Sequence, residues 1–222
     1  MANWTIDVIF GFITVSAFFI LNLYFIRFYR QKQYPYLLLF VLYHVMQMFW
    51  ALTRSLSILF MNKQIHALSA LVLISNSFIT AAFYDIITKE QISPLKMMFA
   101  TALMSIGAVF AFLPGSVIEL PYPNGDPGLD WAGGLLIIGT LSQLFQLFCI
   151  FGALIQIHLR APNELKKYSR GFILMLFMAL SIIGYAAGVK NIVEIPGFEF
   201  LVSISMIILL LYILIKAPQL GY

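Results

Sequence analysis

The chain has 222 residues, of which 62% are hydrophobic and only 10% are charged. An ordinary soluble domain is about a quarter charged, so this composition excludes a water-soluble globular fold. The formal charge is +4, but the basic residues stand in short segments between apolar runs, which is a pattern of membrane topology and not of nucleic-acid binding.

Seven apolar runs of spanning length follow one another along the chain. A helix of about 20 residues crosses the hydrocarbon core of a bilayer. We therefore predict an all-α polytopic membrane protein, a single seven-transmembrane-helix bundle over residues 1–222. The predicted spans are 6–28, 36–61, 67–88, 95–113, 131–158, 170–189 and 198–216. The N-terminal MANWTID has no basic segment typical of a signal peptide, so we expect the first run to be a retained span.

The longest connection is 114–130, PGSVIELPYPNGDPGLD. Its four prolines and three glycines predict a loop and not a helix. Trp131 follows directly, where an aromatic side chain is typical of the membrane interface.

The basic residues predict the orientation. If the N-terminus is outside, only Lys63 and Lys190 fall in outer segments. The inner segments then hold Arg27, Arg30, Lys32, Lys89, Lys96, Arg160, Lys166, Lys167, Arg170 and Lys216. We therefore predict an outside N-terminus, a cytoplasmic C-terminus and a multi-pass protein of the cell membrane.

The run 36–61 carries three groups that lipid would not accommodate: His44, Gln47 and Arg54. Gln47 and Arg54 are seven residues apart and therefore share a helix face. Three interpretations of Arg54 remain open: extension to the headgroups, an ion pair with Asp7, or contact with an anionic ligand.

Four amide side chains fall near mid-membrane depth on the second, third and fifth predicted spans. Hydrogen bonds that only join helices would account for them. The alternative is that they orient a mostly apolar ligand in the bundle, and His44 either joins them or is a packing residue. The candidate ligand-binding residues are His44, Gln47, Arg54, Asn76, Gln143 and Gln146.

Enzyme chemistry finds little support in the sequence. The three histidines fall at three depths, Cys149 is the only cysteine, and no motif of a hydrolase, metalloprotease or phosphate-binding loop occurs. We predict no metal and no cofactor. The last run has no lysine before Lys216, so a retinal Schiff base at mid-membrane is excluded.

The overall layout resembles the seven-span N-terminal sensor regions of bacterial and archaeal histidine kinases. The features that carry the resemblance are the outside N-terminus, the short loops, the basic inner turn RFYRQKQYP and the final ILIKAPQLGY. The resemblance implies a non-catalytic sensor with a cytoplasmic signalling partner, but no functional residues can be transferred from it.

The predicted function is a membrane sensor or receptor module that binds a small apolar or lipid-like ligand and moves its inner helix ends. A small transporter or lipid carrier, and a structural subunit of a membrane complex, are the alternatives. The expected partners are the bilayer, the ligand, a cytoplasmic signalling protein and a second copy of the chain, with no nucleic acid.

Overall fold

A computed structural model describes residues 5–32, 35–89, 91–120, 128–160 and 198–216, together with six separate positions between 166 and 181. Over these residues the chain is mostly helical, with one two-stranded ribbon. The helices are α1 (Ile6–Lys32), α2 (Pro35–Leu59), α3 (Lys63–Lys89), α4 (Pro94–Ala111), α5 (Gly133–Arg160) and α7 (Phe198–Lys216), and the strands are β1 (Val117–Glu119) and β2 (Leu129–Trp131).

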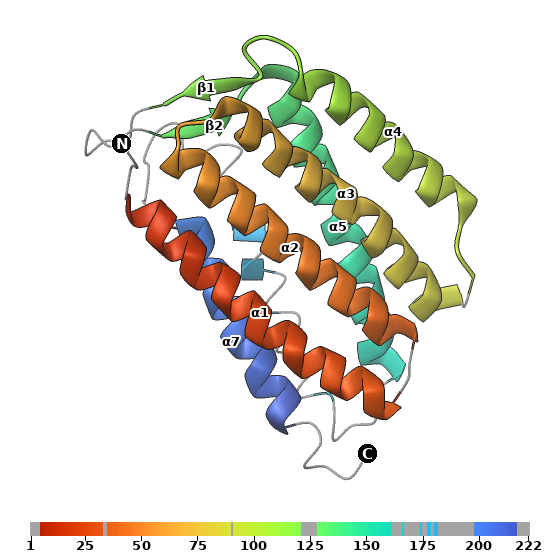
Figure 1. Cartoon of the computed structure of the whole chain (residues 1–222). Helices are drawn as coiled ribbons and strands as arrows, with labels where there is room; N and C mark the ends of the chain where they lie inside the picture. Colours follow the sequence, from red (N-terminus) through yellow and green to blue (C-terminus); the bar gives the residue numbers. More distant parts are fainter. Residues whose placement is uncertain are drawn as a thin grey trace.

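The helices pack as two rows (Figure 1). The helices α1, α2, α3 and α4 lie side by side in one row, and each runs opposite to its neighbour because short turns join them. Behind this row, α5 packs against α3 and α4, and α7 packs against α1. The helix α3 therefore has neighbours on three sides, and most of its apolar length is buried.

The turn between α2 and α3 shows how the sequence ends one helix and begins the next. Met61 adopts a left-handed φ of 49°, which ends α2. The side-chain oxygen of Asn62 then accepts hydrogen bonds from the backbone N–H groups of Gln64 and Ile65, both at 3.0 Å. These two donors would otherwise have no partner in the first turn of α3, so Asn62 is its N-cap.

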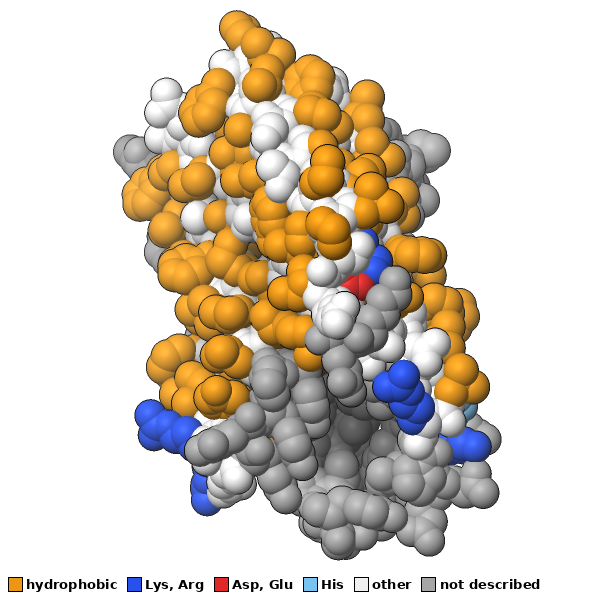
Figure 2. All heavy atoms as spheres, turned by 90° about the vertical axis from the view of Figure 1, so that its right-hand side faces the viewer, with side chains coloured by type: hydrophobic (Ala, Val, Ile, Leu, Met, Phe, Trp, Pro, Cys, Tyr) orange, Lys and Arg blue, Asp and Glu red, His pale blue; other side chains and the backbone are white. Residues whose placement is uncertain are grey.

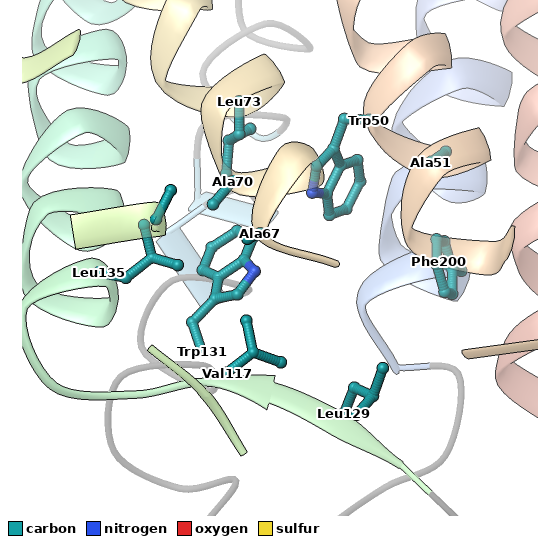
Figure 3. Packing of buried hydrophobic residues seen from close by; sticks show 11 residues of the cluster. Trp50, Ala51, Ala67, Ala70, Leu73, Val117, Leu129, Trp131, Leu135 and Phe200 are labelled. Carbon is teal, nitrogen blue, oxygen red and sulfur yellow. The ribbon is translucent and has the colours of Figure 1, made fainter. Parts of the chain in front are cut away.

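The segment predicted as an irregular loop contains the antiparallel ribbon β1–β2, so that prediction was incomplete. Val117 pairs with Trp131 and Glu119 with Leu129. Val117, Leu129 and Trp131 are all buried, and they complete a hydrophobic cluster with Trp50 and other residues of α2, α3, α5 and α7 (Figure 3). Burial of one apolar side of the ribbon explains why so short a pair of strands forms. Trp131, predicted at the membrane interface, lies in this cluster.

The outer surface of the described helices is strongly apolar. Large side chains such as Met98, Val109, Phe112 and Phe148 are mostly exposed, and Figure 2 shows a wide hydrophobic surface over the face that includes α4. A soluble protein rarely exposes so large a patch, whereas the hydrocarbon core of a membrane requires one.

Four of the described helices are long and apolar enough to cross a membrane: α1, α3, α4 and α5. They indicate a multi-pass membrane protein. The described part of the chain has six helices and not the predicted seven, of which α1–α5 and α7 match predicted spans. The predicted span at 170–189 lies almost entirely outside the described residues.

The helices α1 and α2 lie very close to each other at Gly11. A Cβ placed there would lie 1.9 Å from the Oγ of Ser55 and 3.1 Å from its Cβ. We therefore expect Gly11→Ala to destabilise the protein by about 1–3 kcal/mol, the usual cost of overpacking. Thermal unfolding in detergent measures the effect. Ser55→Ala removes the closer atom, so the double variant should recover part of the loss; equal stability of the single and double variants would contradict this contact.

Candidate functional site

The contacts between helices bring several polar side chains to one depth of the bundle. In an antiparallel helix pair, residues at one level have residue numbers with a constant sum. The Ser57–His66 hydrogen bond (2.8 Å) and the Phe40–Phe83 ring contact (5.5 Å between centroids) give the same sum for α2 and α3. That sum places Gln47 opposite Asn76, and each lies at the middle of its helix.

The neighbouring helices α1 and α5 extend this level. Phe18 and Phe25, on either side of Asn22 in α1, both contact the ring of His44, with centroids 6.0 and 5.4 Å away. Asn22 therefore lies near the level of His44. On the other side, α5 runs parallel to α3, and Ser142 meets Ser77. We call this set the mid-depth layer; it consists of Asn22, His44, Gln47, Asn76, Ser77, Ser142 and Gln146.

Gln146 joins α5 to α3. Its side-chain nitrogen donates to the backbone oxygen of Leu73 at 2.8 Å and to Ser142 Oγ at 3.0 Å, with Ser77 Oγ at 3.4 Å. Ser77 and Ser142 are also hydrogen-bonded to each other at 2.8 Å. All three polar side chains are buried, so their hydrogen bonds connect the helices where water is excluded. This geometry supports the helix-joining interpretation of Gln146.

His44 is a buried packing residue. Its Nδ1–H donates to the carbonyl of Phe40 one turn earlier, at 2.7 Å. Phe18, Phe25, Phe40 and Tyr43 surround the ring, with centroids 4.6–6.0 Å away. A ring that bonds to its own helix and is enclosed by aromatic side chains needs no ligand to account for its position.

Three buried side chains of the described bundle have no hydrogen-bond partner for any of their polar atoms. Both amide atoms of Asn76 and of Asn22 are in this condition, and so is the indole Nε1 of Trp50. Asn76 is 0% exposed, so water outside the protein cannot supply the missing bonds. An unsatisfied buried amide costs about 1–3 kcal/mol, which makes these atoms the strongest sign of a polar partner in the bundle.

Arg54 lies inside the bundle, nearer the end that carries the ribbon. Its residue is 6% exposed, and its guanidinium carbon is 5.9 Å from the ring centroids of both Trp50 and Phe200. These cation–π contacts hold the charge between α2 and α7 and place it away from the bundle surface. Asp7 is also buried, at the corresponding end of α1. The Asp7–Arg54 ion pair remains a prediction.

The other two candidate residues, Gln47 and Gln143, are only partly buried. Gln47 interacts with the side chain of Tyr43, one turn earlier on α2. The structure therefore brings Gln47, Asn76 and Gln146 to one depth but does not give them one environment. Among the described residues, no group of three or more histidine, cysteine or acidic side chains is placed to hold a metal ion.

Two polar clusters were not anticipated from the sequence. Near the ribbon, Ser57 bonds to His66, and the indole of Trp131 donates to the His66 carbonyl at 3.3 Å. At the other end, Asp85 is fully buried and forms an ion pair with Lys96, whose ammonium also lies 4.3 Å from the Tyr84 ring centroid. The sequence feature that could have predicted the Asp85–Lys96 pair is the short turn between α3 and α4. Because the chain reverses there, residue 96 lies at the same level as residue 85.

No protein-family model and no curated protein matches this sequence. The candidate site therefore has to be interpreted from its own geometry.

We expect Gln146→Leu to lower the unfolding free energy by about 1 kcal/mol, as measured for interhelical hydrogen bonds in membranes. The reason is the loss of the amide donor that connects α5 to the Leu73 carbonyl. Thermal unfolding in detergent gives the value. Gln143→Leu, one turn away on the same helix and only partly buried, is the matched control and should have little effect. An equal effect of both variants would refute the role of Gln146.

We expect Lys96→Met to destabilise the protein by about 3 kcal/mol, because it leaves the buried Asp85 carboxylate without its cation. The double variant Asp85→Asn with Lys96→Met carries no buried charge at this position and should recover most of the loss. Lys63→Met, which removes an exposed ion pair with Glu119, is the control and should be nearly neutral. If the double variant were no more stable than Lys96→Met alone, the pair would not be the cause.

Proposed function

We propose that the protein is a non-catalytic membrane sensor whose helix bundle binds a small, mostly apolar ligand at the mid-depth layer. The observation that carries the proposal is Asn76: a fully buried amide in the middle of α3 with no hydrogen-bond partner for either of its polar atoms. Buried polar groups in native proteins nearly always have partners, so a molecule that supplies them is the simplest explanation.

The surroundings of Asn76 favour an apolar ligand over a polar solute. None of the residues of the mid-depth layer carries a formal charge, apart from the capacity of His44 to gain one. Leu73 and Trp50 lie one turn away, toward the ribbon, in the largest hydrophobic cluster. Sites of this composition bind apolar molecules and use a few polar groups to fix their orientation.

We further propose seven spans, an outside N-terminus and a cytoplasmic C-terminus. The antiparallel packing supports the orientation, because it brings the exposed Arg27, Arg30 and Arg160 to one end of the bundle and the ribbon to the other. The Lys and Arg side chains visible in Figure 2 gather mostly toward its lower end.

Signalling would follow from a shift between two packings of the helices. A ligand that bonds to Asn76 stabilises the arrangement in which α3 presents this amide to it, by as much as its affinity differs between the two packings. Because α3 and α5 are joined by Gln146, a displacement of α3 carries α5 with it, and both helices end on the cytoplasmic side in the proposed topology. A cytoplasmic signalling partner would respond to these ends.

The test compares small molecules that copurify with the wild-type protein and with Asn76→Leu, identified by mass spectrometry after extraction from the membrane. We expect a defined species in the wild type and about tenfold less of it per protein in Asn76→Leu, which is the loss of one buried hydrogen bond. The variant should stay folded and be as stable or more stable, because the unsatisfied amide is gone.

The matched control is Ser205→Ala, an exposed position on α7 whose hydroxyl bonds only to its own helix. It should copurify with the same species in the wild-type amount. If no species is enriched in the wild type, or if Asn76→Leu retains it in full, the proposed ligand site is wrong.

A further inference from the structure

The indole N–H of Trp50 gives a second, independent indication of what the bundle binds. The Trp50 side chain is more than nine-tenths buried, and its Nε1 has no hydrogen-bond partner among the described residues. One face of the ring packs near Phe200, with centroids 6.0 Å apart. Figure 3 shows the nitrogen on the side of the ring away from Phe200 and toward α3. Indole N–H groups usually find an acceptor when buried.

The register of α2 and α3 brings Trp50 close to the level of Asn76. The register of the two helices places Trp50 opposite Leu73, one turn from Asn76. Side chains in a helix lean toward its N-terminus. Since the two helices are antiparallel, Trp50 leans toward the level of Asn76, and Asn76 leans toward the level of Trp50.

The chemistry of the two groups determines what they can bind together. An indole nitrogen only donates, whereas an asparagine amide donates from nitrogen and accepts at oxygen. A carbonyl oxygen has two lone pairs and can accept from both donors at once. A carboxylate could also accept, but the Arg54 cation near Trp50 lies on the ribbon side of that ring, where it contacts Trp50 and Phe200. At the level of Asn76, the described groups of the mid-depth layer carry no formal charge, and a carboxylate there would be buried beside them.

We infer that the ligand is an uncharged molecule with an apolar body and a carbonyl oxygen, which accepts hydrogen bonds from Trp50 Nε1 and Asn76 Nδ2. A hydroxyl or N–H group on the same molecule would donate to Asn76 Oδ1, the remaining atom without a partner. This inference rests on the proposed function, because it names the chemical class that the same site takes. An alkane would leave both donors unsatisfied. A buried water would satisfy them without any ligand.

The experiment uses three ten-carbon probes: 2-decanone, decane and decanoate. The full chain, labelled with ¹⁵N-tryptophan, is placed in lipid nanodiscs, and each of its three indole N–H resonances is followed during titration. Trp50→Phe assigns the resonance of Trp50. Trp131 is an internal control, because its Nε1 already donates to the His66 carbonyl and should not respond.

We expect 2-decanone to move the Trp50 indole proton downfield in a saturable manner, with no such change from decane or decanoate. Asn76→Leu should weaken the apparent affinity for 2-decanone about tenfold, because one of two hydrogen bonds is lost. The Trp131 resonance should remain in place in both proteins.

The other outcomes separate this inference from the proposed function. A stronger response to decanoate would overturn the neutral class, and an equal response to decane would overturn the carbonyl. In either case a site in the bundle would still bind ligand. If no probe moves the Trp50 resonance and the indole proton instead shows contact with a bound water, the inference is wrong, and the proposed function then depends on the copurification result alone.

Discussion

The structure depends on one constraint: a polar side chain that is placed among apolar helices must find its partner inside the protein. Within the described residues, some bond to their own helix, as Thr14 and His44 do, and others bond across helix boundaries. Ser57 bonds to His66 between α2 and α3, Gln146 bonds to Leu73 between α5 and α3, and Asp85 pairs with Lys96 between α3 and α4. Lipid is as apolar as leucine, so apolar contact alone does not fix which helix faces which. These polar contacts determine the neighbours of α3 and their register.

The same constraint makes the exceptions informative. Asn22 and Asn76 lie on the two helices that flank α2, close to the level of His44 and Gln47, and neither has a partner for its amide. In contrast, the His44 ring on α2 is hydrogen-bonded to the backbone of its own helix and enclosed by aromatic side chains. A bundle that needed only mechanical cohesion would gain stability from leucine at positions 22 and 76. We therefore base the proposed ligand site on these two amides.

The helices could be predicted from the sequence because each follows from a long apolar run. Five of the predicted spans coincide with α1–α5, and one more coincides with α7. The shared level of Gln47, Asn76 and Gln146 in the bundle was also predictable, because each residue lies near the middle of its apolar run. The roles of these residues were not. Whether an amide joins two helices, as Gln146 does, or has no partner, as Asn76 does, depends on which faces of the helices meet. A sequence without helix contacts does not contain that information.

The partner of the buried Asp85 could not be predicted for the same reason, because the turn before α4 determines it. The ribbon also depends on distant residues, since it forms where Val117 and Trp131 contact an apolar cluster from other helices.

The positions of the buried charged groups are the reason why we propose a sensor and not a carrier for a charged solute. A carrier for a charged solute needs a charge or an interrupted helix at the mid-depth of the membrane. Here α2, α3 and α5 run through the mid-depth layer without interruption. The buried charged residues of the described chain lie toward the two ends: Asp7 and Arg54 near the ribbon, and Asp85 near the opposite end. Between them, the described interior offers aromatic surface and neutral amides. Such an interior suits the mostly apolar ligand of the proposed function. In the proposed function, binding changes the helix packing, and the contacts of α3 with its neighbours transmit that change to the ends that we propose to be cytoplasmic.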